Sequence, residues 1–150
     1  MTAWDEVRDA IASKLDASAG CTAAGLRRAT INVDDPLSAE PEVRVLQPGF
    51  TVLSQSGTSE EYVLDVPFEL IVARPAGLKR SNPLAADIAR AIQVEFQTGI
   101  TLALSLGLVT IVDARLLSMT PGLQEYEDSG YDGYRGVVTV QVFESVTRAA

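Results

Sequence analysis

The spacing of hydrophobic residues near the N-terminus predicts a helix. Apolar side chains recur at intervals of three and four residues, at Trp4, Val7, Ile11 and Leu15. Such intervals place them on one face of a helix. Acidic residues in the first turn and a lysine near the last turn suit the helix dipole. We therefore expect a helix over about residues 3–17.

After this helix the periodicity disappears and then returns as an alternation. Residues 17–41 are rich in small residues, glycine and proline, which predicts a long connection with one short strand at about 30–33. Two short apolar stretches, 43–45 and 50–52, then lead to a polar break at 55–59. This order predicts strands and a hairpin with a polar tip.

The clearest strand signal follows the polar break. Every second residue from Tyr62 to Val72 is apolar, and the residues between them include Asp65, Pro67 and Glu69. Such alternation is typical of an antiparallel strand with one face in the core and one face toward water. Because proline lacks the N–H that a strand donates, we expect Pro67 at a sheet edge or a bulge.

A second helix is predicted from residue 83. Pro83 follows a capping residue, an arrangement typical of a helix start, and the helix is expected to end near Gly99. Its apolar stripe consists of Leu84, Ile88, Ala91, Ile92 and Phe96. Residues 100–106 are apolar without a clear period, so both a helical extension and a short strand stay open there.

The last third of the chain predicts two strands, at 108–119 and 136–146, with a loop at 120–134 between them. The complete order predicts an α+β fold: an antiparallel or mixed sheet with two helices packed on one face, a β-hairpin arm and long loops. Because neither an internal repeat nor a shift in composition divides the sequence, we expect a single domain over 1–150.

Composition excludes several kinds of chemistry. The sequence has no histidine and one cysteine, Cys21, so a Ser-His-Asp or Cys-His nucleophile is excluded and most thiolate or imidazole metal sites are unavailable. With 20 acidic against 12 basic residues, the net charge of −8 argues against a surface that holds nucleic acid through its phosphates. We expect neither catalytic residues nor a cofactor.

The start of the sequence carries no basic and apolar leader, and its longest apolar run is shorter than a bilayer-spanning helix of about 20 residues. These features predict a cytoplasmic protein.

Acidic residues and tyrosines concentrate in residues 124–134. A calcium loop that starts at Asp128 would need an oxygen ligand at its third position, which is Gly130, and a glutamate at its twelfth, which is Thr139. We therefore expect no metal here. Two interpretations stay open: a contact arm, since tyrosine is favoured in interfaces, and a solvated hairpin loop whose tyrosines pack on its own strands.

The order of the segments resembles one known family, the tail terminator or tail completion proteins of long-tailed bacteriophages, over nearly the whole chain. The segments that carry the resemblance are the helix 4–15, the strand Pro41–Val45, the alternating strand 63–72, the helix 83–96, Val112–Leu116, the acidic loop and the closing strand Tyr134–Val140.

This resemblance implies a structural virion protein without enzymatic activity. Such proteins form rings, commonly hexamers, that cap the tail tube and join it to the head-completion or neck protein. The implied partners are further copies of the chain and these two proteins, and DNA would pass the acidic ring lumen without specific binding. The implied location is the virion tail or neck, after assembly from the host cytoplasm. The candidate contact residues are Tyr126, Tyr131, Tyr134 and Arg135, together with the hairpin tip 53–61 and the loop 120–134.

Three other classes stay open on the sequence. The chain could be another head–tail connector or a tail-tube component. It could instead be a cytoplasmic ligand-binding α+β domain with an apolar pocket between sheet and helices. An enzyme would have to work with carboxylates, tyrosines or lysine alone.

Overall fold

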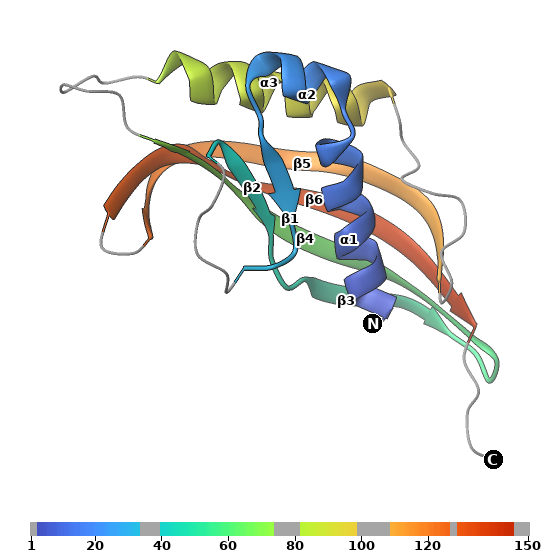
Figure 1. The fold of residues 1–150 in the computed structure, drawn as a ribbon. Coiled ribbons are helices and arrows are strands. Elements are labelled where there is room, and N and C mark those ends of the chain that lie inside the picture. Colours follow the sequence, from blue (N-terminus) through green and yellow to red (C-terminus); the bar gives the residue numbers. More distant parts are fainter. Residues whose placement is uncertain (1–2, 34–39, 74–81, 99–108, 127–128, 146–150) are drawn as a thin grey trace.

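A computed structural model describes residues 3–33, 40–73, 82–98, 109–126 and 129–145. In these segments one six-stranded sheet carries helices on one of its faces (Figure 1). The helices are α1 (Ala3–Asp16), α2 (Ala19–Ala24) and α3 (Pro83–Thr98). The strands are β1 (Arg28–Thr30), β2 (Glu42–Val45), β3 (Gly49–Gln55), β4 (Ser59–Ala73), β5 (Thr110–Tyr126) and β6 (Ser129–Ser145). Residues 100–106 lie outside the described part of the chain.

The sheet is built around β4. Its strand order is β1-β2-β4-β6-β5, and β3 also pairs with β4. β4 pairs with β6 along its whole length, whereas its other edge is shared by β3, at residues 60–65, and β2, at residues 68–71. Only the pairing of β1 with β2 is parallel among the described strands, so the sheet is mixed.

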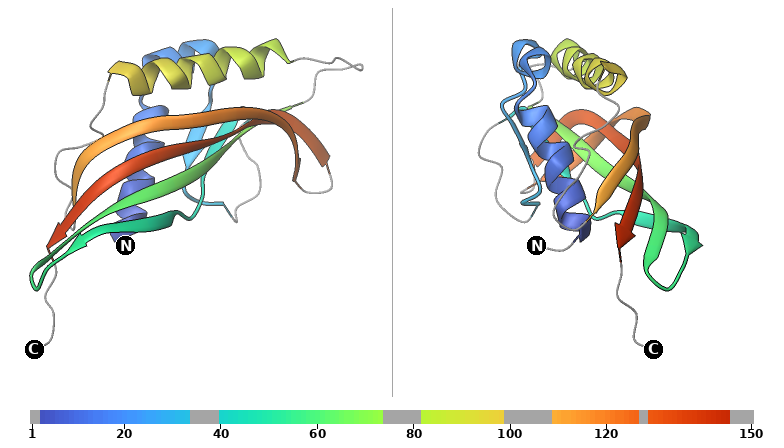
Figure 2. Two further views of the ribbon diagram at one scale, coloured as in Figure 1. Left: turned by 180° about the vertical axis from the view of Figure 1, so that it is seen from behind. Right: turned by 90° about the vertical axis from the view of Figure 1, so that its right-hand side faces the viewer.

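The core lies between one face of this sheet and the helices, as Figure 2 shows from two further directions. Alternate residues of β4 form its floor, among them Leu64, Val66 and Phe68, all essentially inaccessible to water. We call the sheet face that carries these side chains the covered face, and the opposite face, which carries Asp65 and Glu69, the open face. Apolar side chains of α1 and α3 pack on the covered face: Val7, Ile11, Leu15, Ile88, Ile92 and Phe96. The predicted α+β fold with two substantial helices on one face is confirmed.

The connection between the first helix and the first long strand contains an element that the sequence pattern misses. α2 has six residues, too few to show a hydrophobic period. Ser18 caps its start by accepting a hydrogen bond from the backbone N–H of Cys21, and Gly25 ends it at a φ of 118°. The predicted short strand at 30–33 is displaced, because β1 spans Arg28–Thr30.

The predicted loop at 120–134 is wrong. β5 continues to Tyr126 and β6 begins at Ser129, and the two strands pair without interruption from Thr120↔Arg135 to Tyr126↔Ser129. Each strand supplies the hydrogen-bond partners that the other needs, which overrides the weak strand propensity of the glycines here. Pro121 is compatible with this arrangement because β5 is an edge strand.

The expectation that Pro67 lies at a sheet edge or bulge is also wrong, because β4 is central and pairs regularly with β6 at Pro67↔Val137. The carbonyl of Pro67 accepts a hydrogen bond from the N–H of Leu46 at 2.8 Å, at the point where β2 ends and before β3 begins. The nitrogen and oxygen of one strand residue point to the same neighbour. The nitrogen of Pro67, which has no hydrogen to donate, therefore faces the gap between β2 and β3.

Gly136 of β6 is a position where any side chain would clash. It lies opposite Phe68, and a Cβ atom built on it would come within 2.3 Å of the Phe68 ring. We expect Gly136→Ala to lower the free energy of unfolding by about 1–3 kcal/mol, because the buried ring must move. Urea denaturation followed by circular dichroism measures this. Gly122→Ala is the matched control, since a Cβ atom added there would meet nothing within 4 Å beyond its own chain neighbours; equal stability of the two variants would contradict the expectation.

Candidate interaction site at the edges of the sheet

The four residues expected to make contacts do not form one surface. Tyr134 and Arg135 are neighbours in β6, so they point to opposite faces of the sheet. Tyr134 packs against the core under the helices, whereas Arg135 is exposed on the open face, with its Nε 3.7 Å from a carboxylate oxygen of Glu69. Tyr131 is half-buried and shares the face of Arg135. Tyr126 ends β5, and its side chain lies outside the described set.

A groove lies between α3 and β5. It has a volume of about 530 Å³, and its lining includes Arg90 and Gln93 from α3, Leu117 and Met119 from β5, and Tyr134 from β6. One predicted contact residue therefore lines a real concavity. The sequence could not reveal the groove, because helix and strand meet only in the folded chain.

The outer edge of β5 runs along this groove. β5 is the last strand in the sheet order, so this edge has no strand partner within the described residues. Two irregularities interrupt its pairing with β6, at Val112 and at Leu117. The second of these turns the Leu117 side chain outward, where 67% of it is exposed. An unpaired edge beside an exposed apolar side chain is a surface on which another chain can add a strand.

The opposite edge of the sheet ends in a projecting hairpin. We call residues 49–65, which contain β3 and the first half of β4, the arm. Ser56 holds its turn, because its N–H donates to the carbonyl of Ser59 at 2.8 Å. Every residue of β3 is exposed, including Phe50 at 56% and Leu53 at 52%. The predicted hairpin is thus confirmed. It exposes apolar side chains, and exposed apolar patches often mark sites of interaction with other proteins.

The arm is anchored at its base. The ring of Trp4, at the start of α1, lies 5.0 Å from the ring of Phe50, measured between centroids. Tyr62 of β4 donates a hydrogen bond to Glu144 of β6 at 2.8 Å. Burial is the main cause that raises the pKa of the Tyr62 hydroxyl, and the contact with the Glu144 carboxylate is the second. The arm therefore has a defined position relative to the core.

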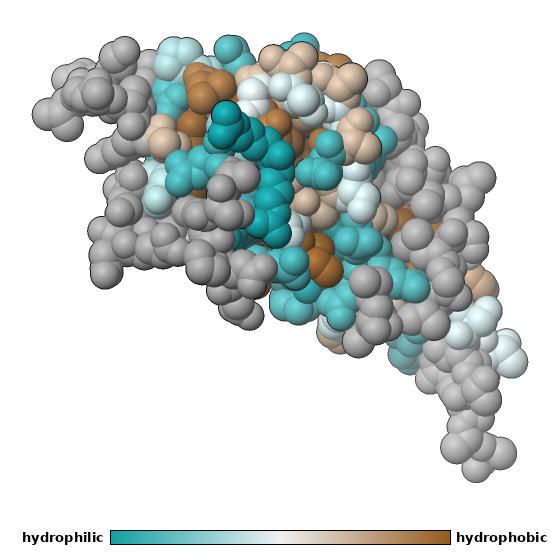
Figure 3. All heavy atoms as spheres, in the orientation of Figure 1, coloured by the Kyte–Doolittle hydropathy of each residue, from teal (hydrophilic) through white to brown (hydrophobic). Residues whose placement is uncertain are grey.

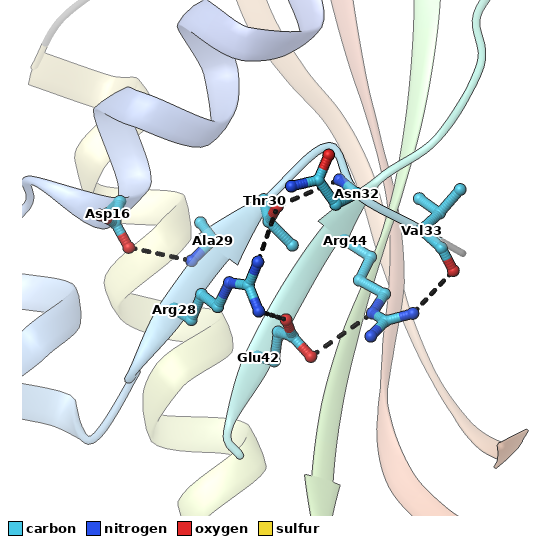
Figure 4. Close-up of polar contacts among 8 residues, drawn as sticks. All are labelled: Asp16, Arg28, Ala29, Thr30, Asn32, Val33, Glu42 and Arg44. Atoms are coloured by element: carbon cyan, nitrogen blue, oxygen red, sulfur yellow. Dashed lines mark hydrogen bonds and ion pairs between the residues drawn. The ribbon is translucent and has the colours of Figure 1, made fainter. Parts of the chain in front are cut away.

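A buried ion cluster lies at the β1–β2 edge (Figure 4). The Glu42 carboxylate is inaccessible to water and lies between two guanidinium groups: Arg28 Nη1 is 3.5 Å from its Oε1, and Arg44 Nε is 3.4 Å from its Oε2. Arg44, only 2% exposed, also donates to the carbonyl of Val33 at 2.7 Å. The surface over β1 is strongly hydrophilic (Figure 3).

The geometry of this cluster indicates a structural role. Arg28 and Glu42 are register partners in the parallel β1–β2 pair, so their contact joins the two strands. The carboxylate is enclosed by its own cationic partners, and the groove described above lies elsewhere, between α3 and β5. We conclude that the cluster fixes β1 and the segment after it onto the sheet.

Other candidate groups have ordinary explanations. Cys21, predicted to be a small apolar side chain, is fully buried, and burial raises the pKa of its thiol. A raised pKa leaves little of the reactive thiolate. Across the described residues, no group of three or more acidic, cysteine or histidine side chains is arranged to hold a metal ion. None of the described helices is both long and apolar enough to span a membrane.

Comparison with known proteins identifies a shared fold. No family model and no curated protein matches the sequence. Among solved structures, a chain of the virion of a native gene transfer agent (GTA) particle is similar, with a TM-score of 0.65 and 17% sequence identity. The match covers 95% of this chain and 99% of that one. The two chains share one fold. At this identity the similarity extends to the architecture and to no individual residue.

The ion cluster yields a stability prediction. We expect Glu42→Gln to lower the free energy of unfolding by about 3 kcal/mol, because it removes the buried carboxylate that lies between the Arg28 and Arg44 guanidinium groups. Asp65→Asn is the control, since Asp65 is exposed on the open face and should change the free energy by less than about 0.5 kcal/mol. Chemical denaturation compares both variants with the wild type. A loss in Glu42→Gln no larger than in the control would refute the structural role.

Proposed function

We propose that this chain is a structural protein of a virion and, within it, the tail terminator: a ring subunit that caps the tail tube and joins it to the head. The observation that carries the proposal is the fold shared with a virion chain over nearly the full length of both proteins. The order of segments quoted above favours the terminator among virion components.

The edges of the sheet support a ring. A closed ring of identical subunits needs two different, complementary surfaces on each subunit. The described sheet offers two dissimilar exposed edges, the outer edge of β5 beside the groove and the arm with its exposed apolar residues. A symmetric dimer would instead use one self-complementary patch.

The four predicted contact residues fit different parts of such an assembly. Tyr134, in the groove, is proposed to contact the neighbouring subunit. Tyr131 and Arg135, on the open face, are proposed to contact the tail tube or neck protein, as is Tyr126 at the end of β5. Contacts of this kind need large amphipathic or cationic side chains, which tyrosine and arginine provide.

The part of the open face nearer the arm is the proposed lining of the channel through which DNA passes, and the end with Tyr131 and Arg135 is the proposed protein contact. Glu61 and Asp65 lie on β4 in this part of the face, and Arg115 of β5 is paired there with Asp113. A surface whose cations are already paired with carboxylates, in a chain with net charge −8, gives DNA phosphates little to bind.

Removing the coding sequence from the genome that carries it tests the proposal. We expect particles in which filled heads and tails are found unjoined and in which tail length is no longer uniform, because nothing ends growth of the tube. Negative-stain electron microscopy measures both properties, and expression of the wild-type chain in trans should restore them.

The outcomes distinguish the proposed role from its alternatives. Failure to form any tail would indicate a tail-tube component. Unjoined heads beside free tails of normal, uniform length would indicate another connector. Particles indistinguishable from the wild type would exclude a virion function altogether.

A further inference from the structure

The open edges of β3 and β5 run in directions that allow them to pair with each other in neighbouring copies. β3 is antiparallel to β4, β4 to β6, and β6 to β5. If a second copy is placed beside the first in the same orientation, its β3 therefore runs antiparallel to β5 of the first. The antiparallel alternation of strand directions then continues from one copy to the next. The backbone N–H and C=O groups on the open edges of β5 and β3 can hydrogen-bond to each other.

The faces match as well as the directions. Phe50 and Val52 pair with Leu64 and Tyr62, whose side chains lie in the core, so all four residues belong to the covered face. The groove opens on this same face, under α3. A neighbouring β3 that adds to β5 would place Phe50 and Val52 in the groove, beside Met119, and remove their apolar surface from water.

The charges are complementary. The groove is bordered by Arg90 on α3, which is exposed. The arm carries Glu60 next to its turn, on the covered face. Opposite charges on the two surfaces favour this pairing over contact between two arms or two grooves, where like charges would meet.

We propose that the arm of one copy docks in the α3–β5 groove of the next copy, with β3 extending the neighbour's sheet at β5. This inference rests on the proposed function, because a head-to-tail contact of this kind generates the ring. A small-molecule ligand is the competing occupant, since the groove has the volume of a ligand site. That alternative leaves the exposed apolar residues of the arm unexplained.

Engineered disulfides test the contact. Thr51 of β3 is exposed on the open face, as are Arg115, Ser118 and Thr120 of β5, so cysteines there leave the core intact. Thr51→Cys is combined in turn with Arg115→Cys, Ser118→Cys and Thr120→Cys, three positions that sample the register of the junction. Within one copy the two cysteines are separated by three strand spacings, about 14 Å, which no disulfide can bridge.

The expected result is a ladder of covalent oligomers on a non-reducing gel from at least one of the three pairs, and its collapse to monomer on reduction. Cross-linking is carried out both in purified particles and in the purified protein. The wild-type Cys21 is buried and gives no background. Thr51→Cys with Val94→Cys is the matched control, because Val94 is exposed on α3 but does not line the groove.

The outcomes separate this inference from the proposed function. If the protein is present in particles but no β5 pair forms oligomers, or the Val94 control forms them equally, the arm-in-groove contact is wrong and the virion role stands. If the protein is absent from particles, the proposed function fails, and the cross-linking of the purified protein still decides the contact. A monomer without cross-links at every tested pair would overturn it.

Discussion

β4 is the strand on which the position of every other strand depends. Its alternating side chains fill the core only if helices cover one face of the sheet, and its 15 residues exceed the 4 of β2 and the 7 of β3 on the other edge. β2 and β3 therefore share that edge, and the interruption between them falls at Pro67, which has no N–H to donate. Because Pro67 lies between the residues that pair with β2 and those that pair with β3, β4 can be a central strand without losing a hydrogen bond to a strand on this edge. The division frees β3 to project as the arm, beyond the part of the sheet that α1 covers.

The β1–β2 corner of the sheet is held by charges as well as by apolar contacts, because Val43 and Val45 lie in the core while Glu42 and Arg44 are buried too. β1 has three residues and pairs, among the described strands, with β2 alone, so few backbone hydrogen bonds hold it. The buried guanidinium of Arg8 on α1 donates to the carbonyls of Val45 and Ile31, at 2.8 and 3.2 Å, and thereby joins helix, strand and the segment after β1. Burying such groups costs desolvation energy, which is offset only while every partner is in place. The geometry of the charged groups therefore specifies this corner in addition to the hydrophobic burial of Val43 and Val45.

The parts of the fold that sequence could predict are those with local periodicity. The stripes of α1 and α3 and the alternation of β4 each depend on residues a few positions apart, and the structure has them nearly as expected. The hairpin of β5 and β6 was missed because the strand character of residues 120–134 comes from cross-strand partners rather than from their own propensity. α2 is shorter than the period that would reveal it. The groove combines α3 with β5, so its shape depends on contacts that no local pattern encodes. Residue type alone makes Tyr134 a candidate contact residue, whereas its place in the groove follows from the register of β6 against β5.

The same one-sided packing gives the protein two unlike edges and two unlike faces, and together they determine how copies can assemble. Helices on one face are bulkier than the bare strands on the other, so a sheet continued from copy to copy has more room if it curves with its helices outside. In the proposed ring the open face faces inward, where carboxylates along β4 and Arg115, already paired with Asp113, present little free positive charge. A lumen of this composition suits a polyanion that must pass and not adhere. For such a subunit the excess of acidic residues has one explanation, because the subunit holds its neighbours and leaves DNA unbound.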